Sequence, residues 1–236
     1  MSIPEPTTTP SLVYLDDFLD SAEFPANLSA LTSPLGDAIG LRSRVDELGV
    51  VCADVPSTVY ALEAKYRQMG PFFMGHGSPA EFQEDGKLIP YKTRVAFGYY
   101  RGVLIELAEP GTGSDLFRLA YDPARSTIHH LGYFARGDEL RRKEGEQSVD
   151  FRERLASAGF AQPHVRALVS VLGFFGRVTI FDTARATRGV DIEFLDFRAL
   201  GRNGIKIGLP PWLLSLGARL QRALGHPVLE LPSSSG

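Results

Sequence analysis

The sequence has a single cysteine, Cys52, among its 236 residues, which excludes an intrachain disulfide and any zinc site built from several cysteines. It also lacks a surplus of basic charge, because 25 Lys and Arg residues stand against 28 Asp and Glu residues, for a formal net charge of -3. No bulk attraction to nucleic acid or to an anionic membrane is therefore expected. No run of about 18 apolar residues is present, so the sequence predicts no membrane-spanning helix.

The N-terminus shows neither the basic region nor the apolar region of a secretory signal peptide, so we expect a cytoplasmic protein. The composition, 44% hydrophobic and 10% aromatic, is typical of a globular chain that folds without disulfides or metals. A small molecule is the expected partner, with neither nucleic acid nor membrane involved. The sequence leaves a homodimer open.

Strand and helix signals alternate in an order that occurs twice along the chain. In residues 45–110 a strand is followed by a helix that begins after Asp54 and then by three strand-like segments, and residues 127–198 repeat the series. We therefore predict an α+β fold of two βαβββ modules. Residues 1–44, interrupted by five prolines, predict an arm that packs on something, and residues 199–236 predict a C-terminal helical extension and tail. The apolar stripe of that helix, which starts at Trp212, should pack on the body or on a second subunit.

The duplication can be checked by register. VDELGVV aligns with IHHLGYF without a gap, which places Glu47 on His130, and VLIELAEP aligns with VDIEFLDF, which places Glu106 on Glu193. Glu47 precedes Glu106 by 59 residues and His130 precedes Glu193 by 63. Four polar residues thus form two equivalent pairs.

Strand alternation places three of these four side chains on otherwise apolar faces. A carboxylate buried alone is very unfavourable unless it is paired, protonated or bound to a cation. Three carboxylates and one imidazole that meet in a concave sheet would suit a divalent cation. Taken singly, each Glu is more typical of a solvent-facing strand position and the His of a hydrogen-bonded core. Only the symmetry of the set favours a shared site.

The segments ELGVVCADV, MGPFF, VLIELAEP, IHHLGYFA and TIFDTARATRGVDIEFLDF together resemble the vicinal oxygen chelate superfamily, which includes glyoxalases, bleomycin-resistance proteins and extradiol dioxygenases. The resemblance is closest to the glyoxalase-like and epimerase-like branch and covers roughly two thirds of the chain. It implies that the two modules form a curved mixed sheet, a cup around a divalent metal. The ligands would come from the first and last strand of each module.

Carried over to this sequence, the resemblance makes Glu106, His130 and Glu193 metal ligands. Glu47 stands where the family usually has a histidine, and it would be a fourth ligand or a general base. Three carboxylates favour Mn²⁺, Mg²⁺ or Fe²⁺, with Zn²⁺ left open. The single histidine argues against an extradiol dioxygenase, whose chemistry uses two histidines and one carboxylate.

The function that the resemblance implies is a metal-dependent isomerase, epimerase or lyase that acts on a small carbonyl compound through an enolate-type intermediate. Glu47 or Glu193 would transfer the proton. Two alternatives remain: a non-catalytic binding protein of the same fold that has lost the metal, and an Fe²⁺ dioxygenase with an unusual ligand set.

Two further histidines and several aromatic residues are predicted to lie near the site or in the core. His76, in FFMGHGSP, is placed in a Gly-flanked loop that could reach a site, although an exposed loop histidine is the simpler interpretation. His129 should point away from His130, towards the opposite face of the strand. Aromatic residues suggest an apolar cup wall, although aromatic residues in strands usually belong to the core; they are Phe97, Tyr99, Phe134 and Phe174.

Overall fold

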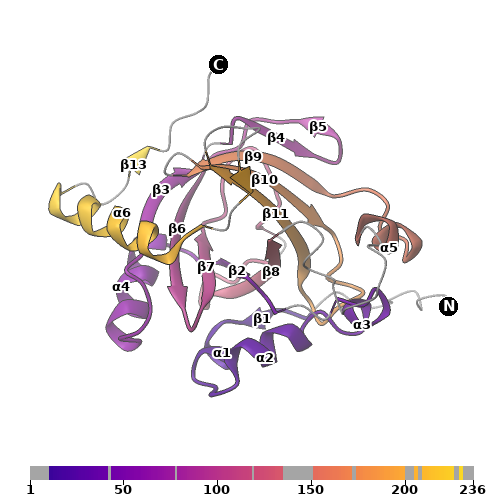
Figure 1. Ribbon diagram of the computed structural model, residues 1–236, viewed down its shortest axis with the longest axis horizontal. Coiled ribbons are helices and arrows are strands. Elements are labelled where there is room, and N and C mark those ends of the chain that lie inside the picture. Colours follow the sequence, from indigo (N-terminus) through magenta and orange to yellow (C-terminus); the bar gives the residue numbers. More distant parts are fainter. Residues whose placement is uncertain are drawn as a thin grey trace.

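The computed structural model describes residues 11–41, 44–77, 79–118, 120–134, 151–171, 174–199, 205–206, 209–225 and 229–230. Its strands form one curled mixed sheet, and its helices lie around the outside of the curve (Figure 1). The fold is therefore an α+β cup, as the sequence predicts.

The first module follows the predicted order of strand, helix and three strands. Its elements are β2 (Glu47–Val51), α4 (Val55–Lys65), β3 (Phe73–Gly77), β6 (Thr93–Tyr100) and β7 (Val103–Ala108). In the sheet these strands lie in the order β3-β6-β7-β2, and β2 runs parallel to β7 while the other pairs are antiparallel.

The second module repeats this arrangement. Its elements are β8 (Thr127–Phe134), α5 (Phe151–Ser157), β9 (Val165–Val171), β10 (Phe174–Phe181) and β11 (Asp191–Ala199). The strand order is β8-β11-β10-β9, again with the first strand parallel to the last. The two first strands, β2 and β8, pair antiparallel and join the modules into one sheet. The duplicated topology is thus confirmed.

A hairpin inside the first module links it to the far edge of the second. β4 (Glu81–Glu84) and β5 (Lys87–Leu88) lie between β3 and β6 in the chain, in addition to the three strands that the sequence predicts after the helix. β4 pairs with β9 rather than with a strand of its own module. The chain therefore crosses from one rim of the cup to the other, which curls the sheet towards closure.

The strands are buried on both faces because a hydrophobic core lies on each side of the sheet. Leu48 and Leu131, which are aligned in the two modules, belong to the outer core beneath the helices. Phe97 and Leu195 belong to a second cluster inside the cup. Burial on both faces explains why the sequence of β8 lacks a clean alternation of polar and apolar residues.

The N-terminal segment covers the outer core. It forms β1 (Val13–Tyr14), α1 (Asp16–Leu19), α2 (Phe24–Ala30) and α3 (Leu35–Ala38), and β1 pairs antiparallel with β8. Leu19, Phe24 and Leu28 are fully buried. Residues 11–41 are therefore an arm that packs on the body of the protein.

Helix α4 begins directly after Asp54, as the sequence predicts. The Asp54 carboxylate accepts a hydrogen bond of 2.8 Å from the Ser57 backbone N–H, which satisfies one of the free donors of the first turn. The helix ends at Lys65.

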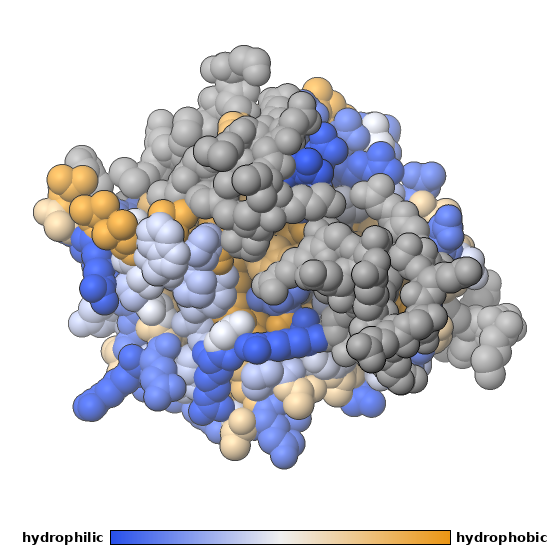
Figure 2. All heavy atoms as spheres, in the orientation of Figure 1, coloured by the Kyte–Doolittle hydropathy of each residue, from blue (hydrophilic) through white to orange (hydrophobic). Residues whose placement is uncertain are grey.

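The C-terminal helix α6 (Pro211–Ala223) packs with a different face from the one predicted. Leu214, Ala218 and Gln221 are buried, and the Gln221 side chain bonds to both the N–H and the C=O of Met74 in β3, at 3.0 and 2.6 Å. The predicted stripe instead faces outward, and its apolar atoms are visible at the position of α6 (Figure 2); its exposed members are Trp212, Leu216, Leu220 and Leu224.

Two short strands, β12 (Ile205–Lys206) and β13 (Leu229–Glu230), pair with β11 and β3. Within the described residues, no helix is both long and apolar enough to cross a membrane.

Candidate metal centre

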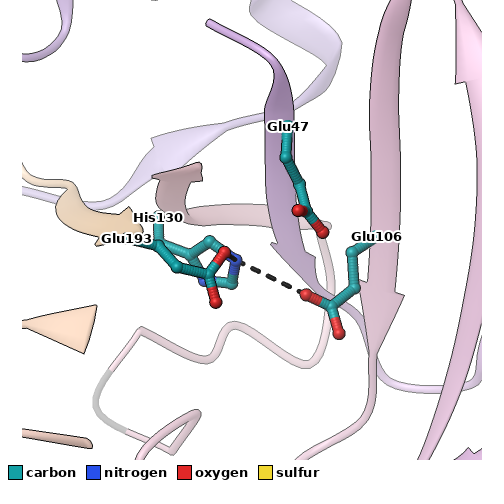
Figure 3. A group of neighbouring side chains, drawn as sticks. All are labelled: Glu47, Glu106, His130 and Glu193. Carbon is teal, nitrogen blue, oxygen red and sulfur yellow. Dashed lines mark ion pairs between the residues drawn. The ribbon is translucent and has the colours of Figure 1, made fainter. Parts of the chain in front are cut away.

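Four neighbouring strands at the bottom of the cup each contribute one polar side chain. The order β7-β2-β8-β11 brings together Glu106, Glu47, His130 and Glu193, and one potential ligand atom from each lies within 4.8 Å of the others (Figure 3). The convergence expected from the aligned register is therefore observed. Their roles as ligands and as proton carriers stay predictions.

The pairing register explains why the four side chains meet. Gly49 of β2 lies opposite both Glu106 and His130, and Gly132 of β8 lies opposite both Glu47 and Glu193. Each module thus supplies one glycine that lies between two of the polar residues, one on each neighbouring strand.

The same two glycines provide the space that the cluster occupies. A Cβ atom at position 49 would overlap the imidazole ring of His130. A Cβ atom at position 132 would lie 2.8 Å from the Cβ of Glu47 and 3.1 Å from Oε2 of Glu193. The alignment of VDELGVV with IHHLGYF pairs these two glycines, but nothing in the sequence marks them as part of the site.

A β-bulge in β8 overturns the expected direction of His129. Gly49 pairs with His130, but Val50 pairs with Ile128, so His129 is an extra residue without a partner on β2. Ile128 consequently joins the outer core instead of sharing a face with His130. The imidazole of His129 turns towards its neighbour, with 3.1 Å between the two Nδ1 atoms. The simple alternation rule was wrong here because it assumes an unbroken ladder.

The cluster is almost completely removed from water. Glu47, His130 and Glu193 are each at most 2% exposed, whereas the Glu106 side chain retains 18% exposure. Nε2 of His130 lies 3.1 Å from Oε2 of Glu193 and 3.5 Å from Oε2 of Glu106.

Burial and like charge shift the titration of these groups. Burial, together with the carboxylates of Glu193 and Glu106, raises the pKa of Glu47 well above its ordinary value. Burial also raises the pKa of Glu193, against the opposing effect of His130. For His130 burial lowers the pKa, but Glu193 and Glu106 outweigh it and hold the pKa well above the ordinary value. Without a further positive charge, the cluster therefore binds protons.

The donor set fits a divalent cation. Oε2 of Glu47, Nε2 of His130 and Oε2 of Glu193 are buried and have no hydrogen-bond partner among the described residues. The short contact between His130 and Glu193 does not have the geometry of a hydrogen bond. Buried polar atoms without partners cost about 1–3 kcal/mol each, and more when they are charged. A cation coordinated by these atoms would satisfy all three.

A cavity of about 90 Å³ opens above the cluster. Its wall is mostly apolar and comes from both modules and from the β4 hairpin; among its members are Phe82, Tyr91, Phe97, Phe117, Leu195 and Phe197. Phe82 and Tyr91 stack with ring centroids 4.3 Å apart. No Lys or Arg is among the described residues that line this cavity.

The expected aromatic wall is thus only partly correct. Phe97 lines the cavity, but Tyr99 and Phe134 do not. The Tyr99 hydroxyl donates to the Leu209 carbonyl instead, and the ring of Phe134 packs on that of Phe197. The side chain of Phe174 lies outside the described residues.

His76 does not lie in a loop. It belongs to β3, where it pairs with Arg94, and the cavity is lined by the next residue, Gly77. Alternation along the strand therefore turns His76 away from the cluster.

The fold and site together define a class: paired βαβββ modules in one cup with a buried carboxylate–imidazole centre, the architecture that the resemblance to the vicinal oxygen chelate superfamily implies. No family model and no curated protein matches the sequence.

Among solved structures, the chain is similar to a mutant of 4-hydroxymandelate synthase from Streptomyces coelicolor, with 15% identity and a TM-score of 0.40 over 76% of this chain. It spans 54% of the length of that synthase. It is also similar to methylmalonyl-CoA epimerase from Mycobacterium tuberculosis, with 18% identity and a TM-score of 0.35 over 64% of this chain and 85% of the epimerase. A hypothetical protein from Bacillus halodurans has 17% identity and a TM-score of 0.36 over 68% of this chain and 98% of its own. The fold assignment rests on the strand order, not on these similarities.

Proposed function

We propose that the protein is a metal-dependent isomerase, epimerase or lyase that acts on a small, uncharged and largely apolar carbonyl compound. The observation that carries the proposal is the convergence of Glu47, Glu106, His130 and Glu193 on one point beneath an apolar cavity, with three of their atoms buried and lacking hydrogen-bond partners in the described residues. All four are electron-pair donors, and such a set is stable in a dry site only around a cation or protons.

Glu106, His130 and Glu193 would hold the ion, with Glu47 beside them. A bound divalent cation would polarise two neighbouring oxygens of the substrate and stabilise the negative charge of an enolate. Three carboxylates and one neutral imidazole favour a hard ion such as Mn²⁺ or Mg²⁺, or Fe²⁺.

Glu47 is the carboxylate that we assign to proton transfer. It removes the proton from the carbon next to the carbonyl, the electron pair of that C–H bond becomes part of the enolate, and Glu47 becomes a carboxylic acid that returns the proton. Burial and its acidic neighbours raise the pKa of Glu47, which makes the carboxylate a stronger base at neutral pH. The apolar wall excludes water from the proton while it is held.

The composition of the cavity supports the substrate class. Since no Lys or Arg is among its described lining residues, no side chain of the wall outside the metal centre would neutralise a phosphate or a free carboxylate. Stacked rings such as Phe82 and Tyr91 suit an aromatic or branched aliphatic group.

Proton exchange at carbon tests the proposal directly. The protein with Mn²⁺ is incubated in D₂O with a panel of apolar 2-oxo and 2-hydroxycarbonyl compounds, the protein and Mn²⁺ are removed, and deuterium at the α-carbon is followed by proton NMR. We expect exchange that disappears with chelator and with Glu47→Gln. Exchange that persists in the variant would show that Glu47 does not transfer the proton. The absence of exchange in every sample would favour the alternative function described next.

That alternative is a non-catalytic protein of the same fold that binds an apolar small molecule. It is favoured by the distances of Nε2 of His130 from Glu193 and Glu106, 3.1 and 3.5 Å, because a protonated His130 at that position would partly neutralise the cluster without a metal. Metal analysis of protein purified without chelator separates the two functions, since the binding protein would carry far less than one ion per chain. An Fe²⁺ dioxygenase ranks third, because His130 is the one histidine in the cluster.

A further inference from the structure

The bulge in β8 places a second buried imidazole behind the candidate metal ligand. His129 is 5% exposed and is not one of the residues that line the cavity or form the cluster. Its ring lies edge-on to the ring of His130, with centroids 5.3 Å apart and an angle of 85° between the planes. Both nitrogens of His129 have neighbours, and these neighbours determine which nitrogen carries the proton.

One end of His129 faces two acceptors. Its Nε2 lies 3.1 Å from the Leu116 carbonyl oxygen and 3.8 Å from Oδ2 of Asp191. The Leu116 carbonyl is held in place by its turn, since the Leu116 N–H donates to the Ser114 hydroxyl at 2.9 Å. A carbonyl oxygen cannot donate, so Nε2 of His129 must carry the proton of this hydrogen bond.

The other end of His129 then has to accept. A neutral imidazole with its proton on Nε2 presents a lone pair at Nδ1. The His129 ring is 5% exposed, and Oδ2 of Asp191 lies at 3.8 Å, beyond hydrogen-bond distance, so the neutral ring is the favourable state. Nδ1 of His130, 3.1 Å away, is therefore the donor of the hydrogen bond between the two rings.

With Nδ1 of His130 committed to a proton, its Nε2 is the atom left for the site. Nε2 points at Glu193 and Glu106, and a lone pair there would be repelled by both carboxylates unless a proton or a metal cation lies between them. We infer that His129 is a positioning residue which, through the fixed Leu116 carbonyl, sets the tautomer of His130 so that Nε2 is the metal-binding atom. Metal binding at Nε2 rests on the proposed function, whereas the hydrogen bonds that set the tautomer do not depend on a metal.

Nitrogen-15 NMR of the imidazole rings tests the tautomers in the wild-type protein. With Zn²⁺ as a diamagnetic probe, Nδ1 of His130 should show the signature of a protonated nitrogen and Nε2 that of a metal-bound nitrogen. Nε2 of His129 should be protonated and its Nδ1 should not. A proton on Nδ1 of His129, or Zn²⁺ at Nδ1 of His130, would overturn the inference. If Zn²⁺ does not bind at all, the proposed metal function fails, and the protonation of the two Nδ1 atoms in the metal-free protein still decides the tautomers.

Two substitutions of similar size separate positioning from packing. His129→Asn keeps an acceptor oxygen near the position of Nδ1, whereas His129→Leu removes it. We expect Mn²⁺ affinity to fall about 10–100-fold in the Leu variant, the usual cost of losing the partner of a metal-bound histidine, and to be largely retained in the Asn variant. If His129 only fills space, the apolar Leu would retain affinity and the Asn would lose it, which would refute the inference. Should neither variant fold, the NMR result decides alone.

Discussion

The imidazole ring of His130 occupies the space that a side chain at Gly49 would need. Gly49 lies on β2 and His130 on β8, so this contact joins the two modules at the centre of the sheet. In the same way, Glu47 and Glu193 occupy the space that a side chain at Gly132 would need. Two glycines at equivalent positions therefore make room for three of the four polar side chains that meet beneath the cavity.

Gly49→Ala should displace His130 and weaken metal binding. A methyl group would force the ring out of its place, and such overpacking typically costs about 1–3 kcal/mol of stability. We expect the affinity for Mn²⁺, measured by calorimetry, to fall about tenfold or more. Gly77→Ala is the matched control, because a Cβ there would meet its nearest neighbours at an ordinary 3.4 Å, and it should bind Mn²⁺ as the wild type does. Unchanged affinity in Gly49→Ala would show that His130 is not a ligand.

Glu47→Gln should affect the metal-free and metal-bound proteins in opposite directions. Because the pKa of Glu47 is raised in the folded protein, ionisation of Glu47 destabilises the metal-free fold progressively as the pH rises above about 4.5, the ordinary value. Gln removes that penalty, so with chelator at pH 7 the variant should melt at or above the wild-type temperature. With Mn²⁺ at about 100 times its Kd the wild type should gain about 2.7 kcal/mol, and the variant clearly less.

The control for this experiment is Glu81→Gln, at an exposed position of β4 away from the cluster. It should melt like the wild type with chelator and with Mn²⁺ alike. If the melting temperatures of all three proteins do not change with Mn²⁺, the metalloenzyme proposal is wrong and the non-catalytic binding protein is favoured.

The sequence was sufficient to predict the duplicated modules and the meeting of four residues. Both depend on register: Glu47 aligns with His130 and Glu106 with Glu193, and the first and last strands of each module are neighbours in the sheet. Within each module the two residues lie on adjacent parallel strands, and β2 pairs antiparallel with β8, so the two pairs come together at the centre of the sheet. The resemblance supplied the pairing of the strands.

Features that depend on long-range pairing could not be predicted. The bulge that turns His129 towards His130 exists because β8 pairs with β2, and nothing local in IHHLGYF marks it. Likewise, β4 became a strand because β9 offered an open edge across the cup. The stripe that begins at Trp212 looked like a packing face, yet α6 docks through Gln221, a polar residue that bonds to the backbone of β3.

Asp54→Ala should destabilise the protein by about 1 kcal/mol, because it removes the acceptor that caps α4. The effect should appear as a lower midpoint of urea unfolding with an unchanged slope. Asp54→Asn keeps an acceptor oxygen and should lose clearly less. Equal losses in both variants would show instead that the ion pair between Asp54 and Arg94, 3.3 Å long and partly exposed, is the larger contribution.

Cys52 should be inert in the folded protein although it is the one thiol of the chain. Burial raises the pKa of Cys52 to about 11, and the thiolate is the reactive form. At pH 8 only about one thiol in a thousand would be ionised even if reagent could reach it, against roughly a quarter for a free thiol of pKa about 8.5.

A chromogenic disulfide reagent should therefore label the native protein at least a hundredfold more slowly than the urea-unfolded protein. The native rate should rise about tenfold per pH unit between pH 7 and 9 if the thiolate reacts in place. Cys52→Ser should give no signal in either state. Rapid labelling of the native wild type would mean that the end of β2 opens readily, and that the centre formed by Glu47 and His130 is less rigid than the burial of these residues implies.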